Sequence, residues 1–345
     1  ELDVIIQGGM KSSSWKHFRD LFRFSLDDFF ISGLGMFGTL CIWLMAIRCC
    51  SLDNVLNYWD AVNLHISLKK DEILRLYDPF LTSVGVSADR AFSPFPLHYL
   101  LIKLLTFCFL GNMKAAKIAI VLVQSALCPL FMHRLLVVHR LSSRPYYSTA
   151  LFIFFPLRFL FMRAVPTADS LFFCLCCATL ISFKVGNIWT TTVCTIFASL
   201  TMPPGFLLFF ALAFASYKTG SIKNGHTYAL FGGIALLLVC QINPSWIDYL
   251  EPNTLHPKHS PVFPMLGVFS SISYIHPLKS LMVLYLLLFC GGLRLIDQSP
   301  AVCAFIVLHG IVLAFLYAYD PYRSSLTVIS FAVFGGLDKV IHKTS

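Results

Sequence analysis

Residues 58–65 read Tyr-Trp-Asp-Ala-Val-Asn-Leu-His and come just after the first long apolar segment of the chain. Asp60 is therefore a carboxylate beside an aromatic ring, Trp59, near the point where an apolar helix would meet water. Inverting glycosyl transfer needs a general base of this kind, which takes the proton from an attacking hydroxyl. The position favours an enzyme acting on a lipid-borne substrate, although an acid near a helix end can also be an ordinary solvated charge.

Three further side chains could serve the same chemistry. Asp169 stands at the expected start of an apolar helix, where an aspartate is also a favoured N-cap. Arg323 lies at another expected helix start, where its positive charge opposes the helix dipole and therefore needs another partner. A phosphate group would suit the guanidinium, and an ion pair with Asp320 is the alternative. His309 lies inside an apolar run, so it is either functional or a hydrogen bond between helices.

The candidate site residues fall into two groups. The catalytic candidates are Asp60 and Asp169, and the substrate-binding candidates are Trp59, His65, Phe95, Arg163, His309 and Arg323. His65 has the weaker case, because five residues after Asp60 is not quite the same face of a helix.

Several signals of other chemistries do not occur in the sequence. It has no glycine-rich phosphate loop, no Asp-x-Asp pair for a nucleotide-sugar metal and no other metal-ligand spacing. We therefore expect a donor that carries its own lipid phosphate, with no metal and no cofactor. Cys174 and Cys177 form a Cys-x-x-Cys in an all-apolar run without a histidine, for which packing is a better explanation than metal binding.

The composition is typical of an integral membrane protein. Of the 345 residues, 57% are hydrophobic and only 12% are charged, against about 25% charged in soluble domains. Apolar windows long enough to span a bilayer recur along the whole chain. The net charge of +9 comes from basic residues in short loops, which report topology and exclude nucleic acid as the expected partner.

The apolar segments predict an all-α polytopic membrane protein. They are residues 30–48, 95–111, 115–138, 146–164, 168–186, 188–203, 204–217, 227–242, 277–295, 300–318 and 324–338. Segment 95–111 either spans or lies along the interface as an amphipathic helix. If it lies flat, most basic loops share the cytosolic side, whereas Lys114 and Lys117 fall on the opposite side of the membrane. We therefore expect about ten spanning helices, with both chain ends cytosolic.

This topology divides the chain into a basic cytosolic segment, residues 1–28, and one transmembrane domain, residues 29–345. The basic segment is not expected to be a cleavable signal peptide, because the following apolar run is too long. Two long loops, 50–114 and 243–276, fall on the far side of the membrane. Asp60, Asp169 and Arg323 then share that face, a result that depends only on the basic residues.

Four blocks of the chain resemble the phosphatidylinositol glycan class V family, the GPI mannosyltransferases 2. Residues 58–66 resemble the family segment W-D-A-x-H-F-x-x-I-A, and residues 91–97 resemble A-F-F-P-x-F-P-L. Residues 168–172 resemble Y-S-E-x-L-F, with Asp169 in place of Glu. The segments that contain His309 and Arg323 resemble the late family blocks V-H and R-F-x-x-S-x-P. Residues 202–205 depart from the family turn R-S-N-G, and loop 243–276 is shorter than usual.

The resemblance implies a GT-C bundle with interfacial helices in the first lumenal loop. It implies an endoplasmic-reticulum enzyme with a lumenal active site that uses dolichyl-phosphate mannose as donor. The reaction would add the second, α-1,6-linked mannose to a GPI glycolipid intermediate. A small membrane accessory subunit is an implied partner.

Three alternatives remain open. Another dolichyl-phosphate-sugar-dependent glycosyltransferase of the same fold would share most of these features. A multi-pass transporter or lipid scramblase would place charged or helix-breaking residues at mid-membrane in matched halves, whereas here they lie at one face without symmetry. A non-catalytic membrane subunit is favoured only by the missing Arg-Ser-Asn turn.

Overall fold

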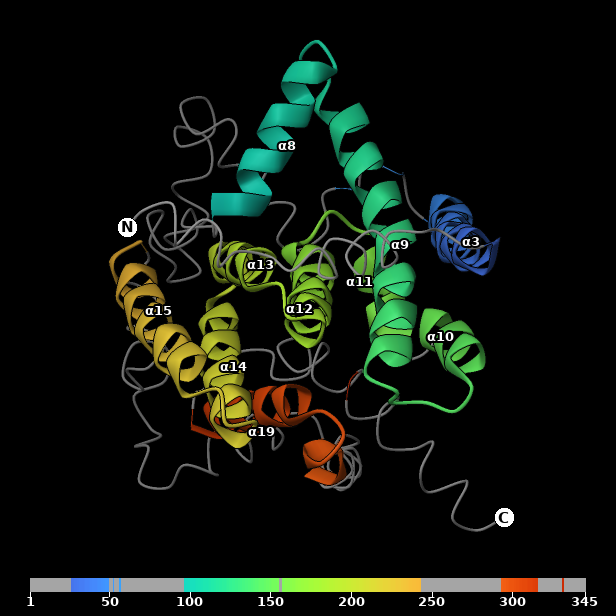
Figure 1. Ribbon diagram of the computed structural model, residues 1–345. Coiled ribbons are helices and arrows are strands. Elements are labelled where there is room, and N and C mark those ends of the chain that lie inside the picture. Colours follow the sequence, from blue (N-terminus) through green and yellow to red (C-terminus); the bar gives the residue numbers. More distant parts are fainter. Residues whose placement is uncertain are drawn as a thin grey trace, which may run out of the picture.

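The computed structural model describes residues 26–49, 96–154, 157–242 and 293–315, together with Leu52, Leu56 and Phe331. All regular structure in these residues is helical, which confirms the all-α class for this part of the chain (Figure 1). The α-helices are α3 (Leu26–Cys49), α8 (Pro96–Cys108), α9 (Met113–Val138), α10 (Pro145–Phe154), α11 (Leu157–Arg163), α12 (Ala168–Val185), α13 (Ile188–Thr201), α14 (Phe206–Lys218), α15 (Ile222–Ile242) and α19 (Pro300–Phe315). Short 3-10 helices lie at η1 (Pro203–Gly205) and η3 (Arg294–Ile296).

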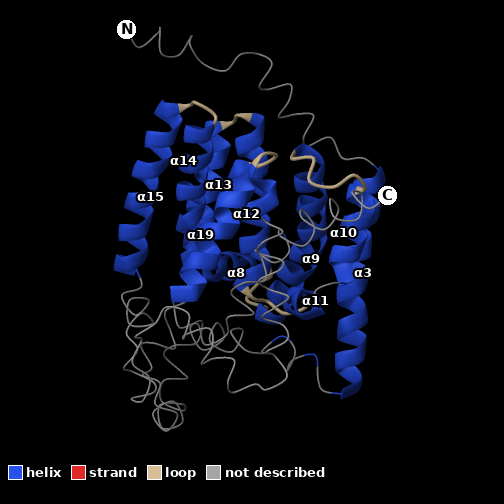
Figure 2. Cartoon of the chain, turned by 90° about the horizontal axis from the view of Figure 1, so that it is seen from below, coloured by secondary structure: helices blue, strands red, loops and turns tan. Residues whose placement is uncertain are grey.

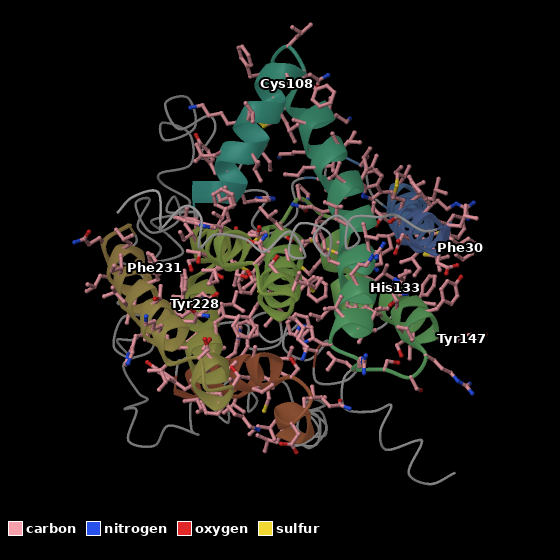
Figure 3. All side chains as sticks on the ribbon, viewed as in Figure 1. Phe30, Cys108, His133, Tyr147, Tyr228 and Phe231 are labelled. Carbon is pink, nitrogen blue, oxygen red and sulfur yellow. The ribbon has the colours of Figure 1, made fainter. Side chains whose placement is uncertain are left out.

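Three helices are long and apolar enough to cross a membrane, at Leu26–Arg48, Met113–Val138 and Ala168–Val185. Large apolar side chains such as Phe30 and Tyr147 lie exposed on the outside of the bundle, whereas Tyr228 points into it (Figure 3). A lipid-facing surface explains this pattern, because lipid does not penalise exposed apolar area. Four shorter apolar helices, of 10–17 residues, fall below the roughly 20 residues of a typical span, and they lie at Leu97–Cys108, Ile188–Thr201, Phe206–Lys218 and Pro300–Ile311.

The described helices depart from the expected segments at two places. Segment 146–164 is described as two helices, α10 and α11, and residues 155 and 156 between them lie outside the described residues. Helix α15 begins at Ile222, five residues before the expected start. Segments 277–295 and 324–338 lie outside the described residues, except for residues 293–295 and Phe331.

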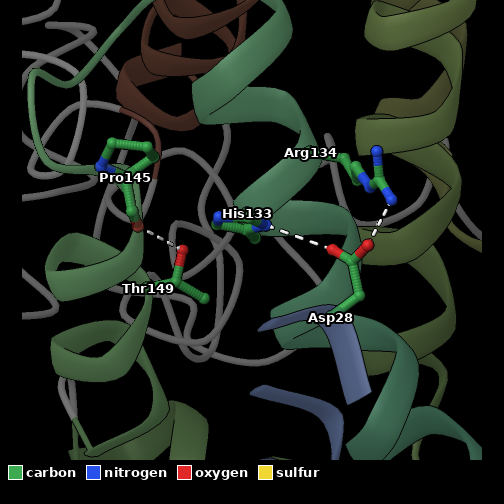
Figure 4. Close-up of polar contacts among 5 residues, drawn as sticks. All are labelled: Asp28, His133, Arg134, Pro145 and Thr149. Carbon is green, nitrogen blue, oxygen red and sulfur yellow. Dashed lines mark hydrogen bonds and ion pairs between the residues drawn. The ribbon is translucent and has the colours of Figure 1, made fainter. Parts of the chain in front are cut away.

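Polar contacts gather at one end of the bundle, where α9, α12 and α14 finish and α3 begins. We call it the basic end, after Arg134, His139, Arg140, Arg144, Lys184 and Lys218. The buried carboxylate of Asp28 binds the guanidinium of Arg134 and lies 3.3 Å from His133 Nδ1 (Figure 4). Since Asp28 opens α3 and Arg134 lies near the end of α9, these two helices run in opposite directions.

His139 ties three helices together at the basic end. Its Nε2 lies 3.0 Å from the carbonyl oxygen of Leu180 in α12, and its Nδ1 lies 2.7 Å from the hydroxyl of Ser299, just before α19. A carbonyl can only accept, so Nε2 carries the proton and the Ser299 hydroxyl donates to Nδ1. Nearby, the Lys218 ammonium lies 3.3 Å from the Asp297 carboxylate.

The opposite end, which we call the far end, is where α3 finishes and α9 and α12 begin. Because α3 runs toward the far end and α9 runs back from it, the segment that joins them starts and finishes there. Figures 1 and 2 show that its helix α8 lies crosswise to α3. Leu100, Leu104 and Phe107 of α8 are exposed, while His98 and Ile102 are buried. Such an amphipathic helix suits an interface, and α8 does not pass between the two ends.

Helices α3 and α9 approach one another closely at Gly35. A Cβ atom at this position would lie 2.4 Å from the carbonyl oxygen of Ser125. Pro129 lies one turn after Ser125 and cannot donate a helical hydrogen bond to that carbonyl. The Ser125 hydroxyl accepts from Thr39 of α3 at 2.8 Å, so a small residue and two hydroxyl residues join the helices.

Removing the charge of Asp28 should destabilise the protein. We expect Asp28→Asn to lower the free energy of unfolding by about 1–3 kcal/mol, because two basic partners lose their acceptor. The matched control is Asp27→Asn, since Asp27 is exposed. Thermal unfolding of both variants in detergent measures the difference, and equal midpoints would mean that the Asp28 contact does not hold α3 to α9.

Acid should weaken the contact that His139 makes. Burial lowers the pKa of His139 to about 4, a direction that the Leu180 hydrogen bond opposes and the charge of Lys184 reinforces. An unfolded histidine titrates near 6.5, so the unfolded state binds more protons between these values. The stability contributed is fully present above pH 6.5 and falls by about 3 kcal/mol as the pH drops toward 4. His139→Gln should flatten this pH dependence of the unfolding midpoint, and an unchanged slope would contradict the assignment.

Candidate functional site

The turn between α11 and α12 lies at the far end and carries two of the predicted site residues. Arg163 ends α11 and is fully buried, with its guanidinium donating to the carbonyl oxygen of Ile153 in α10. Its own carbonyl accepts from the Ser125 hydroxyl at 3.1 Å. The indole nitrogen of Trp43 donates to Ala164 at 2.7 Å. Arg163 is therefore part of the contact between α9, α10 and α11.

Asp169 is buried in the first turn of α12. The N-cap position belongs to Thr167, whose side chain makes no capping bond and donates instead to the Met162 carbonyl at 3.3 Å. The N-cap alternative for Asp169 is therefore wrong, because the helix starts two residues earlier than that alternative requires. A carboxylate in the first turn still interacts favourably with the helix dipole.

His309 lies in the middle of α19 and is 1% exposed. Its ring meets Phe305 edge to face, with centroids 5.6 Å apart. From there a chain of ring contacts crosses the core to the guanidinium of Arg163. In order, its members are His309, Phe305, Phe331, Phe173, Phe152 and Arg163, and the steps measure 5.6, 6.3, 5.5, 5.1 and 5.7 Å. This chain joins two predicted site residues through the aromatic interior of the bundle.

The other predicted site residues lie outside the described residues, namely Asp60, Trp59, His65, Phe95 and Arg323. Leu56, four residues before Asp60 in the sequence, is described. Leu56 is buried, and its carbonyl oxygen lies 3.5 Å from the ammonium of Lys117 near the start of α9. The chain therefore reaches the far end of the bundle four residues before Asp60.

Sequence reasoning missed two buried polar residues of α9, Lys117 and Gln124. Lys117 is 2% exposed and Gln124 is 3% exposed. Gln124 and Cys128 follow Lys117 by seven and eleven residues, so each of their side chains points within about 20° of the direction of Lys117 around the helix axis. This spacing was readable as a polar stripe in an apolar segment, and it marks the inner face of α9.

Cysteines line the contact between α9 and α12. The sulfur of Cys128 lies 3.4 Å from that of Cys174 and 3.4 Å from the carbonyl oxygen of Ser170. Cys176 and Cys177 are fully buried, and both are free thiols, as are Cys128 and Cys174. Within those segments no group of three or more histidine, cysteine or acidic residues could hold a metal ion.

Comparison of the chain with protein-family models, with curated proteins and with solved structures finds no match.

Replacing Arg163 should damage the fold at the far end. Arg163→Met leaves the Ile153 carbonyl without its donor, and we expect a loss of about 1–3 kcal/mol in the free energy of unfolding. The control is Arg144→Met, because Arg144 is exposed. Thermal unfolding in detergent measures both variants. If Arg163→Met unfolds like the wild type and instead weakens ligand binding, Arg163 contacts substrate and is not a scaffold residue.

Proposed function

We propose that the protein is a glycosyltransferase that takes a sugar from a polyprenyl phosphate at the far end of the bundle. Within that class, we propose transfer of the second, α-1,6-linked mannose from dolichyl-phosphate mannose to a GPI glycolipid intermediate. The observation that carries the proposal is that two segments lie toward the same end of α9. Leu56, four residues before Asp60, packs against α9 there, and α12 begins at the same end with Asp169 in its first turn.

In the proposed reaction the acceptor hydroxyl attacks the anomeric carbon of the donor sugar. Asp60 takes the hydroxyl proton as the new carbon–oxygen bond forms. The bond from the anomeric carbon to the phosphate oxygen breaks on the opposite side, so the configuration inverts and the polyprenyl phosphate leaves with its electron pair. Arg323 stabilises the departing phosphate through charge-assisted hydrogen bonds. No redox or metal step is needed.

The resemblance of four sequence blocks to the phosphatidylinositol glycan class V family supports the finer proposal. It extends to a GT-C bundle of about ten spans, an endoplasmic-reticulum location with a lumenal site, and a small membrane accessory subunit. The turn at residues 202–205 differs from the family pattern R-S-N-G in its first three residues and shares only the last, Gly205. A Cβ at Gly205 would lie 2.4 Å from the backbone of Ala198, so this glycine has a steric role in the turn from α13 to α14.

Asp60→Asn tests the proposal directly. The variant should reach the membrane in normal amounts and transfer mannose about 10²-fold more slowly, since an amide cannot accept the proton. Microsomes supplied with dolichyl-phosphate mannose and a GPI acceptor provide the assay. Asp53→Asn, in the same segment of the sequence, is the matched control. Near-normal transfer by Asp60→Asn would contradict the assigned base.

A further inference from the structure

A polar stripe runs along the inner face of α9 from the far end. Lys117 stands closest to that end, Gln124 follows two turns later, and Cys128 follows after one more turn. Burial distinguishes Lys117 from its neighbour, since Lys114, one turn before it, is exposed. A lysine buried this close to a helix N-terminus also opposes the helix dipole, so its position must be stabilised by something other than the helix.

Two polar side chains, one in the stripe and one on the facing helix α12, are buried without hydrogen bonds to any described residue. Both amide atoms of Gln124 and the hydroxyl oxygen of Ser170 are in this state. Native proteins pair nearly all buried polar groups, because an unpaired donor or acceptor is strongly unfavourable. A neighbouring residue shows the normal arrangement, since the buried Ser125 hydroxyl has two partners. Gln124 and Ser170 therefore suit an occupant that supplies hydrogen bonds.

The register of α9 and α12 places Gln124 and Ser170 at one level of the bundle, with Lys117 two helical turns beyond them. The helices run in the same direction, because Cys128 contacts Ser170 near the start of α12 and His139 contacts Leu180 near its end. Gln124 lies one turn, about 5.4 Å, before Cys128. It is therefore level with the beginning of α12, where Ser170 lies, and Lys117 with the Leu56 carbonyl lies beyond it toward the far end.

We propose that Lys117, Gln124 and Ser170 form a buried site for the head of a lipid-linked sugar phosphate. The ammonium of Lys117 binds the phosphate, and the amide of Gln124 and the hydroxyl of Ser170 bind sugar hydroxyls. An ammonium suits a phosphate, and an amide offers both a donor and an acceptor to neutral hydroxyls. The inference rests on the proposed function and assigns these residues to the donor of that reaction.

Binding of two probes to the purified protein in detergent tests the site. One probe is a short-chain polyprenyl phosphate mannose, and the other is the same polyprenyl phosphate without the sugar. Lys117→Gln should weaken both about tenfold or more, since a charge-assisted contact is lost, and Lys117→Arg should recover part of the affinity. Lys114→Gln, the exposed lysine of the same turn, should leave both affinities unchanged.

Gln124→Leu and Ser170→Ala isolate the sugar contacts. Each should weaken the mannose-bearing probe several-fold and leave the bare phosphate probe unchanged. Neither substitution should impair folding, because each removes polar atoms that lack partners in the described residues. These two variants therefore decide the matter even if Lys117→Gln does not fold. Unchanged binding of the mannose probe, or no binding of either probe by the wild type, would overturn the site.

The outcome also separates this site from the proposed function. Probe binding that depends on Gln124, in a protein that transfers no mannose, would keep the site and reject the transferase. Mannose transfer with an unchanged KM for the donor in Lys117→Gln and Gln124→Leu would keep the transferase and reject the site.

Discussion

Charged side chains are costly inside an apolar bundle, so they lie at its ends or in closed contacts. In this protein the contact between Asp28 and Arg134 fixes α3 antiparallel to α9 at the basic end. The contacts of His139 with Leu180 and Ser299 then orient α12 and α19 against α9. Once these directions are set, the starts of α9 and α12 must lie at the opposite end, where the candidate chemistry gathers.

The far end is organised differently, because its polar groups point inward. Arg163, Trp43 and Ser125 bind backbone carbonyls there and hold the α11–α12 turn against α3 and α9. The turn in turn places the first residues of α12, including Asp169 and Ser170, beside the inner face of α9. The polar interior at the far end suits the proposed site for a charged lipid head.

The sequence predicted the features that depend on local pattern. The long apolar runs at 30–48, 115–138 and 168–186 correspond closely to α3, α9 and α12, since length and composition decide them. Basic residues alone predicted that the ends of α9 and α12 lie together, and the contact of His139 with Leu180 agrees with this.

Contacts between distant residues could not be predicted in this way. His139 and Ser299 are 160 residues apart, and no local pattern pairs them. The same holds for the aromatic chain between Arg163 and His309, and for the close approach of Gly35 to Ser125. The N-cap was the alternative role for Asp169 because Asp favours that position, whereas the fold gives the N-cap to Thr167, two residues earlier.

The central claim is that this chain adds the second mannose of a GPI anchor. The most direct measurement introduces the chain into cells that lack the second GPI mannosyltransferase and follows the lipid intermediates by mass spectrometry. The account predicts that the intermediate with one mannose is consumed and that the intermediate with two mannoses appears. Persistence of the one-mannose intermediate, in cells where the chain is present in the endoplasmic reticulum at normal abundance, would contradict it.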